Sequence, residues 1–175
     1  MAFDNTGRGW LSNAIHSIAA SMVKFRSYMD SAIRQAQVAG QANEVPVGCV
    51  IVGPKGQVLS QAGNQTRQDN DPTAHAEILA IRQACKVIGQ DRLAGCDLYV
   101  TLEPCAMCAA AIAHARIARV YFGASDPKSG GVLNGARVFT HPQCHHKPEV
   151  YDGISEAECA ALLVGFFKDR RKPAL

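Results

Sequence analysis

The sequence lacks any uninterrupted run of about 18 apolar residues, because Gly, Lys, Asp or Arg interrupts every long candidate. It also lacks a basic start followed by a long apolar run and a cleavage site, so a secretory signal is not expected, although an organellar transit peptide stays open. Like-charge blocks and Ser-, Gln- or Pro-rich tracts are missing too, which argues against disorder. These absences predict a soluble, folded, cytoplasmic protein with no membrane partner.

The chain has little net charge but many cysteines. Its 18 Lys and Arg against 15 Asp and Glu give a formal net charge of +3, which permits binding to a polyanion without indicating one. Seven cysteines is an odd number, and two of them, Cys105 and Cys108, form a Cys-x-x-Cys pair. A chain of 175 residues can bury a core without disulfides, so this usage favours a reducing compartment and a metal site.

Hydrophobic periodicity predicts one α/β domain. Apolar residues three or four apart predict a helix over 22–38, and Val- and Ile-rich runs at 45–52 and 57–62, joined by Gly-Pro-Lys-Gly, predict a hairpin. The remaining segments alternate between helix and strand: helix 74–87, strand 96–102, helix 106–115, strand 119–123, loop 125–135 and helix 155–172. This alternation predicts a layered domain whose later strands are parallel.

Two short motifs carry the chemistry. His-Ala-Glu at 75–77 and Pro-Cys-Ala-Met-Cys at 104–108 match the His-x-Glu and Pro-Cys-x-x-Cys signature of zinc nucleobase deaminases. One imidazole and two thiolates are good zinc ligands, and three protein ligands leave the fourth tetrahedral position open, as in catalytic sites. We expect His75, Cys105 and Cys108 to lie at two helix N-termini, whose partial positive charge favours thiolate over thiol.

Glu77 is the predicted proton-transfer group. If His75 and Glu77 were both helical, they would lie about 200° apart around the helix, an objection that weakens if His75 sits in a frayed first turn. Glu77 can then accept a proton from the attacking water and deliver it to a ring nitrogen and to departing ammonia.

Two simpler interpretations of the cysteines stay open. One is a structural zinc site completed by Cys96 or Cys85, and the other is a coincidental cysteine pair in an apolar helix. The five cysteines outside the pair are predicted to be small, buried apolar residues: Cys49, Cys85, Cys96, Cys144 and Cys159.

Longer segments carry a specific resemblance, from about residue 27 to the end. They are VPVGCVIV at 45–52, GNQT at 63–66, DPTAHAEILAIR at 71–82, LYVTLEPCAMC at 98–108 and ARIARVYFGASDPKSG at 115–130, and they are similar to bacterial tRNA-specific adenosine deaminases. The resemblance implies the cytidine deaminase-like fold, a three-layer α/β/α domain around a mixed five-stranded sheet. It also implies one Zn²⁺ per subunit, a homodimer, and conversion of adenosine to inosine at the first anticodon position of an arginine tRNA with an A-C-G anticodon.

The resemblance further implies contacts with the substrate. Asn64 matches an asparagine that contacts the base or the ribose, although asparagine is also an ordinary turn residue. Asp126 matches an aspartate near the nucleotide, where a carboxylate can hold a ribose hydroxyl; the alternative is an Asx turn. The backbone amide of Cys105, at a helix N-terminus, can donate to the oxygen of the tetrahedral intermediate.

The C-terminal stretch FFKDRRK resembles the family's closing aromatic and basic segment. Phe167, Arg170 and Arg171 are therefore predicted to supply a stacking ring beside phosphate-binding cations. Basic residues at a helix C-terminus also complement the helix dipole without any ligand.

Two features depart from the family pattern. Residues 1–21 form an N-terminal extension of uncertain role ahead of a deaminase domain at 22–175, and Cys49 stands where the family commonly has alanine. Two other functions stay open. One is deamination of a free base or nucleoside of the guanine or cytosine type, because the zinc motif is shared. The other is a non-catalytic, zinc-stabilised RNA-binding module, against which Glu77 argues.

Overall fold

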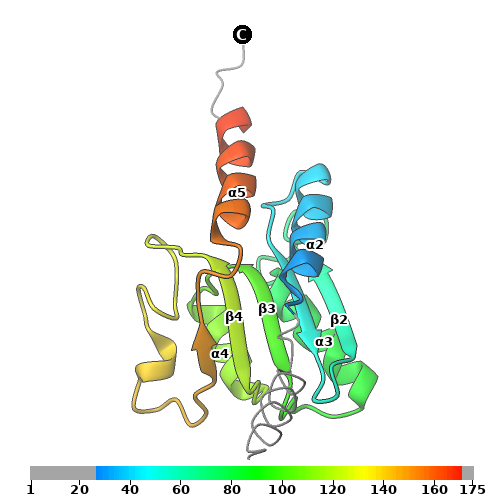
Figure 1. The fold of residues 1–175 in the computed structure, drawn as a ribbon, viewed down its shortest axis with the longest axis vertical. Coiled ribbons are helices and arrows are strands. Elements are labelled where there is room, and N and C mark those ends of the chain that lie inside the picture. The colour runs from blue at the N-terminus through cyan, green and yellow to red at the C-terminus, as the bar shows by residue number, and fades with distance from the viewer. Residues whose placement is uncertain (1–26, 171–175) are drawn as a thin grey trace, which may run out of the picture.

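The computed structural model describes residues 27–170, which are built around a mixed five-stranded β-sheet (Figure 1). The strand order is β2-β1-β3-β4-β5, where β1 is antiparallel to both of its neighbours and β3, β4 and β5 are parallel. The strands are β1 (Gly48–Val52), β2 (Val58–Gly63), β3 (Asp97–Leu102), β4 (Arg119–Ala124) and β5 (Glu149–Tyr151). The predicted hairpin and the predicted parallel later strands are both confirmed.

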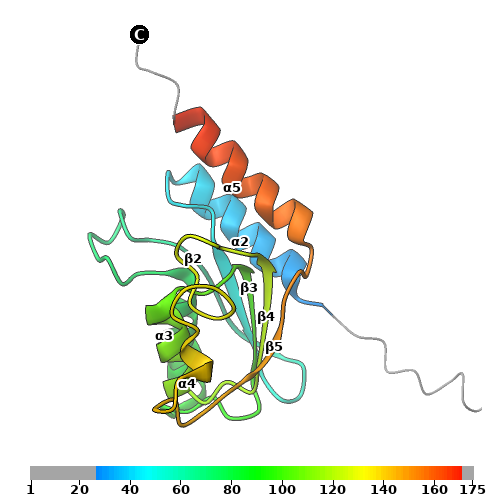
Figure 2. The same cartoon turned by 90° about the vertical axis from the view of Figure 1, so that its left-hand side faces the viewer.

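Helices cover both faces of the sheet and give three layers (Figure 2). Helices α2 (Met29–Gln41) and α5 (Glu156–Arg170) lie on one face, and α3 (Ala76–Ile88) and α4 (Ala106–His114) lie on the other. Along β1, Cys49 and Ile51 pack into the core under α3 and α4, whereas Val50 and Val52 pack under α2. The predicted three-layer fold is confirmed, and none of the described helices is long and apolar enough to cross a membrane.

Several predicted boundaries are wrong. Helix α2 begins at Met29 rather than at residue 22, because residues 27 and 28 are not helical; residues 1–26, including the predicted extension, lie outside the described part. Strand β1 begins at Gly48 rather than Val45, consistent with Pro46, which has no N–H to donate to a ladder. Helix α3 begins at Ala76 rather than Ala74. The three residues of β5 are too few to produce a periodic signal.

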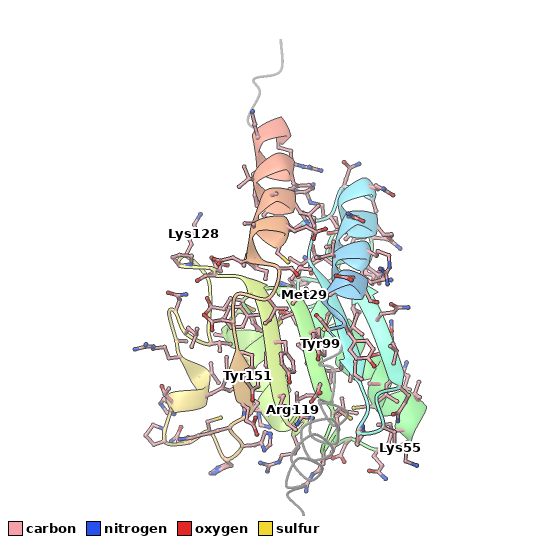
Figure 3. All side chains as sticks on the ribbon, in the orientation of Figure 1. Met29, Lys55, Tyr99, Arg119, Lys128 and Tyr151 are labelled. Atoms are coloured by element: carbon pink, nitrogen blue, oxygen red, sulfur yellow. The ribbon has the colours of Figure 1, made fainter. Side chains whose placement is uncertain are left out.

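Stacked tyrosines hold the short edge strand to the sheet (Figure 3). The rings of Tyr99 and Tyr121 are 4.5 Å apart between centroids, and those of Tyr121 and Tyr151 are 4.8 Å apart, both nearly parallel. At the same end of the strands the Arg119 guanidinium pairs with the Asp97 carboxylate at 2.7 Å. Side-chain pairs across neighbouring strands stabilise a sheet, so this row compensates for the brevity of β5.

We expect Gly48→Ala to destabilise the fold. A Cβ atom at Gly48 would collide with the backbone of Ala32 and Ala36 in α2, which cannot move without unpacking the helix from β1. The free energy of unfolding should fall by about 1–3 kcal/mol, as overpacking generally costs, measured by denaturant titration.

The matched control is Gly165→Ala in α5, where a Cβ atom meets nothing within 4 Å. That change should raise stability by about 1 kcal/mol, because alanine favours a helix over glycine. A Gly48→Ala protein as stable as the unmodified chain would contradict the tight approach of α2 to β1.

Candidate active site

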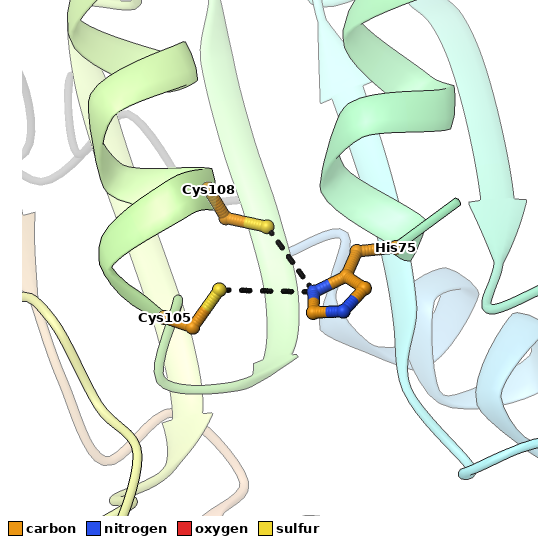
Figure 4. A group of neighbouring side chains, drawn as sticks. All are labelled: His75, Cys105 and Cys108. Atoms are coloured by element: carbon orange, nitrogen blue, oxygen red, sulfur yellow. Dashed lines mark hydrogen bonds between the residues drawn. The ribbon is translucent and has the colours of Figure 1, made fainter. Parts of the chain in front are cut away.

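The three predicted metal ligands meet where two helices begin (Figure 4). His75 and Cys105 are the N-cap residues of α3 and α4, both with extended backbone, and Cys108 lies in the first turn of α4. The His75 Nδ1 atom is 3.7 Å from the Cys105 sulfur and 3.5 Å from the Cys108 sulfur. All three ligand atoms lie within 4.8 Å of one another, so the structure brings the predicted set together.

The donor set fits zinc. One imidazole nitrogen and two sulfurs are the ligands that Zn²⁺ accepts in tetrahedral sites, and three of them leave one position open. Among the described residues, His75, Cys105 and Cys108 form the one group placed to hold a metal ion. The alternative of a structural site completed by Cys96 or Cys85 is therefore wrong.

Electrostatics prepare the thiols for a cation. Hydrogen bonding from the Cys108 thiol, helped by His75, lowers the pKa of Cys105 to about 4 despite its partial burial. The same hydrogen bond and burial raise the pKa of Cys108, and the contact with Cys105 raises the pKa of His75. Cys105 is thus a thiolate at neutral pH, and a coordinated metal ion would deprotonate the Cys108 thiol as well.

Glu77 lies beside the ligands in the first turn of α3 and is 4% exposed. Because His75 precedes the helix with a ψ of 151°, the two side chains do not diverge as two helical residues would. Burial raises the pKa of the Glu77 carboxyl. A carboxyl whose pKa moves toward neutrality can both accept and release a proton.

A cavity of about 180 Å³ opens next to these groups. It lies beyond the carboxyl ends of β3 and β4, the usual position of a ligand site in an open α/β sheet. Its polar lining residues are Asn64, His75, Glu77, Glu103, Cys105, Asp126 and Ser129. The cavity can therefore present a small polar ring to the predicted metal ligands and to Glu77.

Asn64 has a fixed orientation at the cavity. Its side-chain Oδ1 accepts a hydrogen bond from the backbone N–H of Ala76 at 3.0 Å, and the residue is 8% exposed. Only the oxygen end of the amide can accept that bond, so the Nδ2 end is left as a donor. Asn64 is more than a surface turn residue, because it fastens the end of β2 to the start of α3.

Asp126 forms the Asx turn that was predicted from the sequence as the alternative to a substrate contact. Its Oδ1 accepts hydrogen bonds from the backbone N–H groups of Lys128 at 3.1 Å and Ser129 at 3.0 Å. The residue also lines the cavity, so its carboxylate is held in place next to the space that a ligand would fill. The Asx-type turn and a position at the site occur together.

Sequence reasoning missed Glu103, the residue that organises this side of the cavity. Its Oε1 accepts from the N–H groups of Val132, Leu133 and Asn134, and its Oε2 accepts from the Asn134 amide at 2.6 Å and the Asp126 N–H at 3.0 Å. Burial opposes ionisation, yet these donors outweigh it and hold the pKa below its ordinary value. The available signal was a charged residue directly after a buried apolar strand.

The C-terminal residues lie away from the cavity lining. The Arg170 guanidinium donates to the side chain of Asn43 at 2.9 Å and stands 3.6 Å from the centroid of the Phe166 ring. Phe167 is 43% exposed, and Arg171 lies outside the described residues. Arg170 is therefore already engaged by the protein. The Phe167 ring makes an edge contact with Phe166, at 5.3 Å between centroids, and still exposes part of its surface.

The remaining cysteines agree only partly with the prediction. Cys49, Cys96 and Cys159 are buried, but Cys85 and Cys144 are half-buried, so that part of the prediction is wrong. All seven cysteines lie within the described residues, and none of them forms a disulfide there. Burial, followed by the nearby Glu77 carboxylate, raises the pKa of Cys49, which therefore stays a neutral thiol.

We expect Cys108→Ser to abolish tight zinc binding, because a hydroxyl is a far weaker ligand than a thiolate. The zinc content of purified protein should fall from about one ion per chain to well below half, measured by elemental analysis after dialysis. Cys85→Ser is the control and should keep its zinc. Equal loss from both variants would contradict the three-residue ligand set.

Comparison with known proteins agrees with the geometry. Residues 22–124 match the model of the cytidine and deoxycytidylate deaminase zinc-binding region. A tRNA-specific adenosine deaminase of Agrobacterium fabrum is 53% identical over 150 residues, covering 86% of this chain and 98% of that protein.

Solved structures give the same result. A structure from a study of A-to-I editing by tRNA deaminases at the wobble position is 56% identical, with a TM-score of 0.76 over 78% of this chain and 98% of that one. A guanine deaminase from Bacillus subtilis is 31% identical, with a TM-score of 0.56 over 84% and 93%. The chain therefore belongs to the zinc-dependent cytidine and deoxycytidylate deaminase family and, within it, to the tRNA-specific adenosine deaminases.

Proposed function

We propose that this protein deaminates adenosine to inosine at the wobble position of a tRNA anticodon, with an arginine tRNA carrying A-C-G as its substrate. The observation that carries the proposal is the cavity lined by Glu77, Asn64 and two of the predicted ligands, His75 and Cys105, with the third, Cys108, close to both. The choice of tRNA over a free base rests on identities of 53% and 56% to tRNA deaminases, against 31% to a guanine deaminase.

The reaction adds water across the C6 position of adenine and releases ammonia. Zinc on His75, Cys105 and Cys108, when bound, supplies a Lewis acid that makes water a nucleophile near neutral pH. Glu77 accepts one proton of the attacking water and donates it to the ring nitrogen N1. It then takes the proton of the hydroxyl group added at C6 and gives it to the amino group, which leaves as ammonia when the bond from C6 to that nitrogen breaks. The backbone N–H of Cys105, at the N-cap of α4, donates to the oxygen added at C6.

Asn64 and Asp126 hold the nucleotide. The Nδ2 group of Asn64 donates to an acceptor on the base or the ribose, because its Oδ1 is committed to Ala76. Asp126, fixed by its turn, accepts from a ribose hydroxyl, the group that separates RNA from DNA. An anticodon loop already presents unpaired bases, which reduces the cost of extruding the target base.

Contacts with the rest of the tRNA fall to the C-terminal helix. Phe167 supplies an exposed ring for stacking, and Arg171 supplies a cation for phosphates. Arg170 supplies a second cation by exchanging its contact with Asn43 for a phosphate. We further propose that the enzyme acts in the cytoplasm as a homodimer, with residues 22–175 as the deaminase domain and 1–21 as an extension. The family match also begins at residue 22, which supports that division.

The substrate can be tested directly. Zinc-loaded protein is incubated with an unmodified A-C-G arginine tRNA and, in parallel, with free adenosine, guanine and cytosine; inosine is read by sequencing and ammonia by assay. We expect inosine only at the first anticodon position. Ammonia from guanine or cytosine alone would reverse the choice of substrate.

We expect Glu77→Gln to keep its zinc and lose turnover. The amide occupies the same space but cannot accept the proton from water, so kcat should fall by about 10²–10⁴-fold, the usual contribution of a general acid–base group. Single-turnover kinetics on the tRNA and zinc analysis measure both quantities. Full turnover in this variant would exclude the mechanism. If the unmodified, zinc-bound protein binds RNA without deaminating it, a non-catalytic module would be favoured instead.

A further inference from the structure

A second buried carboxylate lies outside the cavity, at the corner between α2 and β1. Glu44 is 1% exposed and is not among the cavity-lining residues. Its Oε1 accepts hydrogen bonds from the backbone N–H groups of Arg67 at 2.8 Å and Gln68 at 2.9 Å, and its Oε2 accepts from the Thr66 hydroxyl at 3.1 Å. All three donors belong to the loop between β2 and α3, residues 64–75.

Hydrogen bonds between the two ends of this loop lie on either side of His75, a predicted metal ligand. The Gln65 N–H donates to the Ala74 carbonyl at 3.0 Å, and the Ala76 N–H donates to the Asn64 side chain at 3.0 Å. Ala74 and Ala76 are the residues on either side of His75. The base of the loop thus fixes Asn64 and His75 relative to each other, while Glu44 holds the segment that follows Asn64 and Gln65.

The charge of Glu44 is strongly compensated. Burial opposes ionisation, but the donors from Gln68, Arg67 and Thr66 outweigh it and hold the pKa of this carboxyl below its ordinary value. A buried carboxylate that accepts several backbone N–H groups cannot be removed without leaving those groups unpaired. The loop segment 66–68 therefore depends on one side chain from another element.

The same corner also contacts the C-terminal helix. The Asn43 carbonyl accepts from the Arg67 side chain at 3.4 Å and from Arg170 at 3.3 Å. The loop and α5 thus share an attachment point next to Glu44.

We propose that Glu44 is a positioning residue for deamination: by holding residues 66–68 it sets the positions of Asn64 and His75 at the cavity. It acts through the loop and contacts no substrate. The choice of assay rests on the proposed tRNA function. A displacement of about 1 Å at a reacting centre can cost about 10²-fold in rate, so a loosened loop should lower kcat measurably.

Three variants at position 44 separate the effect of side-chain length from the effect of charge. Glu44→Gln keeps one oxygen for the two backbone N–H groups and an amide for the Thr66 hydroxyl, so kcat should stay within about threefold of the unmodified enzyme. Glu44→Asp keeps the charge but is one methylene too short, and Glu44→Ala removes the acceptor; both should lower kcat by about tenfold or more. The KM for the tRNA should change less than kcat, because Glu44 itself contacts no substrate.

The control is Asp69→Asn, which removes one negative charge from the same loop at an exposed residue. It should leave kcat and KM unchanged. Values of kcat are expressed per bound zinc, so that a loss of metal is not mistaken for a displacement of Asn64 and His75.

Amide hydrogen exchange supplies a readout that needs no substrate. In Glu44→Asp the N–H groups of Arg67 and Gln68 should exchange at least about tenfold faster, while those of Leu133 and Asn134, held by Glu103, keep their protection. Glu44→Asp is the second variant in case Glu44→Ala does not fold.

Several results would overturn the proposal. An unchanged kcat per bound zinc in Glu44→Asp would overturn it. Amide hydrogen exchange that becomes faster throughout the chain would also overturn it, because it would show that Glu44 only stabilises the fold. If the unmodified protein leaves tRNA untouched but deaminates a free base, the proposed function fails. The variants are then compared on that base, so the role of Glu44 is judged separately.

Discussion

The constraint on which the structure depends is that an imidazole and two thiolates must meet at one point, although His75 and Cys105 are thirty residues apart. The sheet meets this constraint by supplying a common edge for the two segments. Both segments pass from extended backbone into a helix at the ligand itself, so both helix N-termini face the same space. The positive ends of the two helix dipoles favour thiolate, and the ligand sulfurs lie within 4.8 Å of the imidazole nitrogen.

Three buried glutamates show how the surroundings divide one residue type into two roles. Glu44 accepts from two backbone N–H groups and a hydroxyl, Glu103 accepts from four backbone N–H groups and an amide, and in both the donors outweigh burial and lower the pKa. Glu77 is equally buried, but burial prevails and its pKa is raised. A carboxylate whose donors outweigh burial stays ionised and holds a loop, whereas one for which burial prevails can exchange a proton.

Short motifs and periodicity were sufficient to predict the ligand set, Glu77 and most of the elements, because those signals are local. The position of His75 was not predictable from spacing, since it depends on an N-cap backbone angle rather than on helical geometry. Glu44 and Glu103 were missed because their partners lie more than twenty residues away and are backbone groups, which leave no trace in side-chain identity. Strand β5 is recognisable only by its pairing with β4.

This arrangement separates chemistry from substrate choice. The predicted metal ligands and Glu77 lie at helix starts that are fixed by the sheet, and a guanine deaminase shares that fold at 31% identity. The polar walls of the cavity that would meet a substrate come instead from the loop carrying Asn64 and the loop carrying Asp126. Each loop is held by hydrogen bonds to one buried carboxylate, which belongs to another part of the chain. Glu44 holds the loop that carries Asn64, and Glu103 holds the loop that carries Asp126. Changes at loop positions that keep the hydrogen bonds to Glu44 and Glu103 can therefore alter which base is held, while the groups predicted to activate water stay in place.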